Sequence, residues 1–173
     1  MAETFALFAL ECAVEQVADR YRNELQEQIE DERRHISVFS EWRGLELREI
    51  NRIRRTREDY VWFTLLLVNE LTGYCQFQML SSLVETEAQR DEVDRICKDE
   101  EKHIDRLIRW LFPVKGSSRA VVPREIVLRF ERELPQRMQQ FMPREELAPL
   151  RGAIAAQVSI LLRWVLDEVL APH

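Results

Sequence analysis

Two stretches of the chain, DERRH at residues 31–35 and DEEKH at residues 99–103, share the pattern Asp-Glu-x-(Arg or Lys)-His. In each stretch the glutamate and the histidine are three positions apart, so on a helix they lie on one face. A carboxylate and an imidazole on one face can bind one metal ion together. Two such pairs that face each other across a bundle of helices can hold two metal ions.

Both glutamates lie on helical faces that are otherwise apolar. The positions one and two turns away hold Leu25, Ile29, Ile36 and Phe39 around Glu32, and Val93, Cys97, Ile104 and Leu107 around Glu100. An ionised carboxylate on an apolar face is strongly unfavourable unless it is paired or bound to a metal ion. We therefore predict four metal ligands from these stretches: Glu32, His35, Glu100 and His103.

A site for two metal ions needs a further carboxylate from each neighbouring helix. Glu70, 30 positions before Glu100, has apolar or aromatic helical neighbours and is the candidate from one helix. Glu3, 29 positions before Glu32, is the candidate from the other. Glu11 is the alternative to Glu3, because it is only 21 positions before Glu32 and lies about 80° around the helix from Glu3.

This order of residues resembles the ferritin-like di-iron carboxylate superfamily, whose pattern is Glu … Glu-x-x-His … Glu … Glu-x-x-His. The resemblance covers about residues 3–110. It implies an all-α fold built on a ferritin-like four-helix bundle, to which the helical pattern of the sequence adds two C-terminal helices. It also implies two iron ions that change between Fe²⁺ and Fe³⁺, with manganese as the alternative metal.

The resemblance further implies a role for each candidate. Glu32 and Glu100 would bridge or chelate the two metal ions. The ligands to one metal ion each would be His35, His103, Glu3 and Glu70. Asp31 and Asp99 would accept hydrogen bonds from the metal-bound imidazoles, which fixes the orientation and tautomer of the rings.

The composition supports a helical fold. The chain of 173 residues has only 4 glycines and 6 prolines, too few for the turns of a β-sandwich or barrel. Apolar residues recur with the helical period almost throughout. The predicted helices cover about 2–18, 21–42, 58–82, 87–112, 123–141 and 144–170, with Thr86 as a helix cap. We expect a single domain over 1–173, with a metal-binding core at 1–112 and a helical cover at 113–173.

The predicted chemistry is oxidation. Carboxylate-rich sites suit iron or manganese better than structural zinc, so we expect a non-haem di-iron oxidoreductase that uses O2 to oxidise or oxygenate a small organic substrate. Tyr74, one turn after Glu70, is the candidate catalytic side chain outside the ligands. Two alternatives remain: a ferroxidase or peroxidase that handles iron or peroxide, and a non-catalytic helical protein with a structural metal site.

Charge and cysteine content bear on partners and location. The net charge of −6 disfavours nucleic acid as a partner. The longest apolar stretch, residues 61–68, is too short to span a membrane. Three cysteines without a C-x-x-C pair fit a reducing, cytoplasmic location. We expect O2, a small-molecule substrate and an external electron donor as partners. The oligomer that we consider is a homodimer.

Overall fold

A computed structural model describes residues 2–43, 58–111, 124–141 and 148–164, together with 145 and 167; within the helices the side chains of 2–5, 43, 124–127, 130, 137, 138, 140 and 141 are not described. These residues confirm the all-helical prediction, since none of them lies in a strand. The elements are α1 (Ala2–Val14), the 3-10 turn η1 (Asp19–Tyr21), α2 (Arg22–Arg43), α3 (Asp59–Ser81), α4 (Glu87–Leu111), α5 (Arg124–Phe141) and α6 (Ala148–Trp164).

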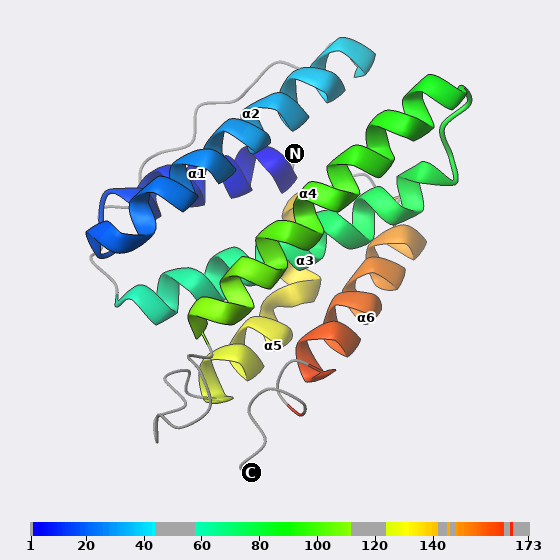
Figure 1. Ribbon diagram of the computed structural model, residues 1–173. Coiled ribbons are helices and arrows are strands. Elements are labelled where there is room, and N and C mark those ends of the chain that lie inside the picture. Colours follow the sequence, from blue (N-terminus) through cyan, green and yellow to red (C-terminus); the bar gives the residue numbers. More distant parts are fainter. Residues whose placement is uncertain are drawn as a thin grey trace.

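The helices pack as three pairs. Helix α1 lies against α2, α3 against α4, and α5 against α6 (Figure 1). Helix α3 is central, because it contacts α1, α4, α5 and α6. Its sequence explains this position: every residue from Trp62 to Gly73 is buried, so no face of this part of the helix is left for solvent.

The turn between α3 and α4 is fixed by its cap. Thr86 Oγ1 accepts a hydrogen bond from the Gln89 backbone N–H at 3.2 Å, and Gln89 Oε1 accepts one from the Thr86 backbone N–H at 3.3 Å. This reciprocal pair is a capping box, which stabilises the first turn of a helix. The predicted cap at Thr86 is confirmed, and α3 and α4 form an antiparallel hairpin around this turn (Figure 1).

The first helix is shorter than predicted. It ends at Val14 instead of about residue 18, because the backbone N–H groups of Gln16 and Val17 both donate to the Ala13 carbonyl and turn the chain towards α2. The last helix, predicted at 144–170, is described over Ala148–Trp164. The predicted boundary at residues 112 and 113 lies outside the described part of the chain.

Two buried apolar clusters lie along the α2, α3 and α4 helices. The larger includes Leu25, Ile29, Leu66 and Leu107, and the smaller consists of Phe39, Phe77, Val93 and Ile96. On each helix, the candidate glutamate falls between a member of one cluster and a member of the other. The candidate ligands therefore lie where the two clusters meet.

Among the described helices, none combines the length and apolar character that crossing a bilayer requires.

Candidate metal centre

Four of the predicted ligands come together in the interior. Glu32 of α2, Glu70 of α3, and Glu100 and His103 of α4 each offer one ligand atom, and these four atoms all lie within 4.8 Å of one another. All four residues are at most 2% exposed. We call this group the Glu/His cluster. It has the donor types and the spacing to hold a metal ion.

The second predicted imidazole, His35, also faces this group. Its Nδ1 lies 3.4 Å from Glu100 Oε1 and 3.9 Å from Glu32 Oε2. The Nδ1 atom of His103 lies 3.1 Å from Glu70 Oε2 and 4.0 Å from Glu32 Oε1. Both rings therefore turn the same nitrogen towards the carboxylates, although they come from different helices.

The other ring nitrogens meet the two predicted aspartates. His103 Nε2 lies 3.1 Å from Asp31 Oδ2, and His35 Nε2 lies 3.5 Å from Asp99 Oδ2. Each aspartate thus serves the histidine of the other stretch, so α2 and α4 exchange contacts across the centre. A carboxylate that accepts a hydrogen bond from Nε2 leaves the Nδ1 lone pair directed at the cluster.

The negative charges of these aspartates are paired with two basic residues, to which the sequence patterns assigned no role. Arg34 Nη2 donates to Asp99 and lies 3.4 Å from Asp31 Oδ1. Lys102 Nζ lies 3.9 Å from Asp31 Oδ2. The signal was present in the sequence, because both stretches carry a basic residue directly before the histidine.

The two imidazoles differ in their electrostatics. Burial opposes a charge on His103, but hydrogen bonds to Asp31 and Glu70 outweigh it and raise the pKa of this histidine. Since carboxylates only accept, both ring nitrogens of His103 donate and the ring carries a positive charge. Burial lowers the pKa of His35, and the hydrogen bond to Asp99 does not compensate. His35 is therefore the neutral ring.

The carboxylates respond to the same contacts. Burial acts to raise the pKa of Glu70, but the hydrogen bond and the charge of His103 lower it overall. The hydrogen bond from His103 likewise lowers the pKa of Asp31 against the effect of burial. In the metal-free protein a proton on His103 thus occupies the place where a cation would act, and a metal ion would replace the Nδ1 proton.

Unpaired buried atoms test whether the centre fits a metal ion. His35 Nδ1 and Glu70 Oε1 are buried and make no hydrogen bond with any described residue. Both atoms are metal-ligand types, and both belong to residues that face the cluster. Three buried carboxylates and one charged imidazole would also leave a net negative charge if all three were ionised. The residues present therefore fit a divalent cation.

The sequence offers two candidate ligands from the first helix, Glu3 and Glu11. Glu3 lies in α1, but its side chain is outside the described part, so this prediction stays a prediction. Glu11, the alternative, has 39% of its side chain exposed and pairs with Arg33 Nη2 at 3.0 Å. An exposed, paired carboxylate gains little from a metal ion, so the position of Glu11 speaks against it as a ligand.

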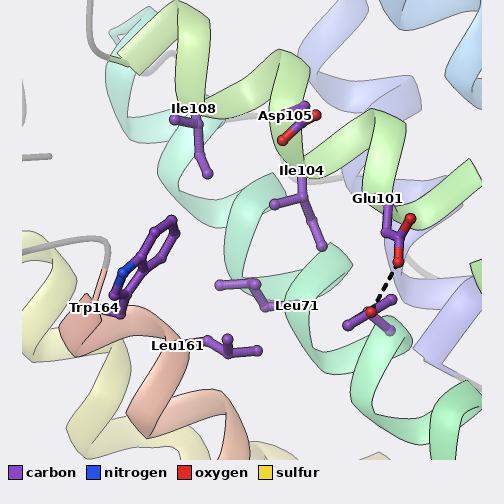
Figure 2. A pocket seen from close by; sticks show the side chains of 8 residues that line it. Leu71, Glu101, Ile104, Asp105, Ile108, Leu161 and Trp164 are labelled. Carbon is purple, nitrogen blue, oxygen red and sulfur yellow. Dashed lines mark hydrogen bonds between the residues drawn. The ribbon is translucent and has the colours of Figure 1, made fainter. Parts of the chain in front are cut away.

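Tyr74 pairs with a residue outside the cluster. Its hydroxyl donates to Glu101 Oε1 at 2.9 Å, the dashed line in Figure 2. Burial, followed by this hydrogen bond, raises the pKa of Tyr74 to about 12. The side chain lines a pocket of about 150 Å³ between α3, α4 and α6, formed by Leu71, Tyr74, Glu101, Ile104, Asp105, Ile108, Leu161 and Trp164. The catalytic role predicted for Tyr74 stays a prediction, and its hydroxyl lies in this outer pocket.

Two further residues next to the cluster had been overlooked. Gly73 lets α3 approach α4 closely, because a Cβ at this position would lie 3.2 Å from Glu100 Oε2. Gln28 is one turn before Glu32 on α2 and is fully buried. A polar residue on the stripe of Leu25, Ile29 and Glu32 was the signal in the sequence that marked Gln28.

Comparison of the chain with family models, with curated proteins and with solved structures found no match. The resemblance to ferritin-like proteins therefore depends on the residues and their arrangement alone.

Proposed function

We propose that this protein binds two iron ions, with manganese as the alternative, and is an O2-dependent oxidoreductase. The observation that carries the proposal is the buried Glu/His cluster of α2, α3 and α4. In this proposal α1–α4 form a ferritin-like four-helix bundle and α5 and α6 cover α3. Bound iron would supply electron transfer to O2, with an external donor restoring the reduced state.

The choice of metal follows from the donor set. The described ligands comprise three carboxylates and two imidazoles, and no cysteine is among them. Hard oxygen donors together with imidazole favour iron or manganese over soft-metal or structural zinc sites. Glu3 would complete the set with a fourth carboxylate, which gives a neutral site with two divalent ions.

The protein's own residues would do three things. The carboxylates and Nδ1 atoms bind the metal ions, and Asp31 and Asp99 hold the protons on the two Nε2 atoms. The Phe77 ring packs edge-on to His35 at 6.3 Å, and the cluster has almost no solvent exposure. An enclosed apolar surrounding excludes water and strengthens electrostatic interactions within the site.

The proposed function has two versions, which differ in the substrate. Oxidation of a small organic molecule is the first version, supported by the apolar side chains on either side of the centre. The second version has iron or peroxide as the substrate, and such small substrates need no large pocket beside the centre. The pocket of Figure 2 agrees with this version, because none of the cluster residues lines it and its volume of about 150 Å³ is small for an organic ligand.

Anaerobic titration with Fe²⁺ tests the metal centre. We expect about two iron ions per chain and, after exposure to O2, a ligand-to-metal absorption band. Binding of less than one iron ion per chain would refute the proposal. Excess Fe²⁺ then separates the two versions: oxidation of many equivalents indicates iron as the substrate, whereas oxidation that stops near two equivalents favours an organic substrate.

A further inference from the structure

Gln28 is a buried amide without a partner. Its side chain is fully buried, and neither Nε2 nor Oε1 makes a hydrogen bond within the described structure. A buried amide that lacks hydrogen bonds destabilises the folded chain, because it loses its contacts with water and gains none in return. An apolar side chain of similar size would avoid this cost.

The position of Gln28 points to the metal centre. It precedes Glu32 by one helical turn, so the two side chains lie on the same face of α2. Its amide is near enough to Glu70 for a weak hydrogen-bonding interaction that helps to lower the pKa of that carboxyl group, although the two groups do not reach regular hydrogen-bond geometry. Glu70 Oε1 is itself buried and unpaired. An unpaired donor and an unpaired acceptor thus face each other beside the cluster.

The neighbours of Gln28 on its own helix are apolar. Leu25 and Ile29, the neighbours of Gln28 on its face of α2, are apolar and at most 1% exposed. These two neighbours offer the amide no hydrogen-bond partner. The cluster side, by contrast, offers the free oxygen of Glu70 and the space between the carboxylates where a cation fits.

We propose that Gln28 is a positioning residue of the metal centre: its amide N–H donates to Glu70 Oε1, and its amide oxygen accepts a hydrogen bond from a water molecule held in the loaded centre. This inference rests on the proposed metal binding and deepens it. Gln28 orients Glu70 towards the metal and is not itself a ligand. The buried amide is thereby unfavourable in the metal-free chain and favourable in the metal-bound one.

The test compares Gln28→Leu with the unchanged chain by Mn²⁺ titration, followed through the electron paramagnetic resonance signal of free Mn²⁺. Partners that orient ligands typically contribute about 10- to 100-fold to metal affinity, so we expect a loss of that size. The melting temperature of the metal-free protein should rise by about 2–4 °C, since the unpaired amide is gone. A residue that only supports packing would not combine these opposite effects.

Two further variants make the result decisive. Gln28→Met keeps the length of the side chain without its hydrogen bonds and should lose affinity to the same extent, which covers the case that Leu does not fit. Asn69→Leu is the control, because Asn69 Nδ2 is also buried and unpaired but its residue lies one position from Glu70, about 100° around α3. Its affinity should match that of the unchanged chain.

The possible outcomes distinguish a failure of this inference from a failure of the proposed metal-binding function. If the unchanged chain binds no Mn²⁺ and no Fe²⁺, the proposed function fails. If it binds metal and both Gln28 variants keep an affinity within about twofold, the positioning role of Gln28 is overturned while the metal centre stands. An equal loss of affinity in Asn69→Leu would also overturn it, since the effect would then be general to buried amides.

Discussion

Glu100 and Glu101 are neighbours on α4, yet they belong to two different regions. Glu100 is 2% exposed and lies in the Glu/His cluster on the side of α2. Glu101 is exposed and lines the pocket on the side of α6, where it accepts a hydrogen bond from Tyr74 (Figure 2). Identical side chains one position apart thus meet a buried group of acidic and histidine side chains on one face and an apolar pocket on the other.

The difference shows what burial requires of a carboxylate. On the inner face Glu100 lies 3.4 Å from His35 Nδ1, among groups that can bind a cation. On the outer face water and a neutral phenol suffice for Glu101, because the raised pKa of Tyr74 keeps its proton in place. The inner region therefore has the residues that could hold a metal ion, whereas the carboxylate of the outer region pairs with a phenol.

The largest expected effect separates these two glutamates directly. Glu100→Ala should lower the affinity for Fe²⁺ by more than about 100-fold, since it removes a ligand and outer partners alone contribute about 10- to 100-fold. Glu101→Ala should leave the affinity unchanged. Anaerobic equilibrium dialysis with metal analysis measures both. Comparable losses in the two variants would mean that the inner and outer regions are not distinct.

The next effect sharpens the description of the inner region. Asp31→Asn should weaken metal binding by about 10- to 100-fold, because Asp31 lies 3.1 Å from the ring of His103. Asp99→Asn should weaken it less, because the Asp99 contact with His35 is longer, at 3.5 Å. The same dialysis experiment gives the order of the two variants, and the reverse order would contradict the distances.

The two described glycines give a smaller effect with opposite signs. Gly152→Ala on α6 should stabilise the protein by roughly 0.5–1 kcal/mol, since an added Cβ meets nothing within 4 Å and alanine favours helix. Gly73→Ala should gain no stability in the metal-bound protein, because its Cβ would press on Glu100 Oε2 at 3.2 Å. We expect about a tenfold loss of metal affinity for Gly73→Ala and none for Gly152→Ala. Thermal melts with and without metal test both variants.

The smallest effect concerns the outer region. Tyr74→Phe removes the hydrogen bond to Glu101 but leaves the ring in the pocket. Metal affinity and stoichiometry should stay within about twofold of the unchanged chain, and so should the rate of O2-dependent oxidation, measured with an oxygen electrode. A large loss of oxidation rate would instead support the catalytic role predicted for Tyr74 and would join the two regions functionally.

Much of the helical architecture was predictable from the sequence because helical period and cap residues are local signals. The ranges of α2, α3 and α4 agree with the predicted ones to within a residue or two, and Thr86 caps α4 as expected. The end of α1 was missed because the turn after Val14 carries no glycine or proline. Its hydrogen bonds to the Ala13 carbonyl depend on how the chain enters α2.

The sequence by itself determined that Glu32 lies beside His35 and Glu100 beside His103 on the buried faces of their helices. Residues three positions apart share a face of a helix, and the apolar neighbours show that this face is buried. Only the tertiary structure decided how these residues pair. Asp31 serves His103 and Asp99 serves His35 across the helices, Gln28 approaches Glu70, and Tyr74 turns to Glu101. Period 3.6 fixes the face of one helix, but the rotation and register of neighbouring helices depend on the packing of the whole core.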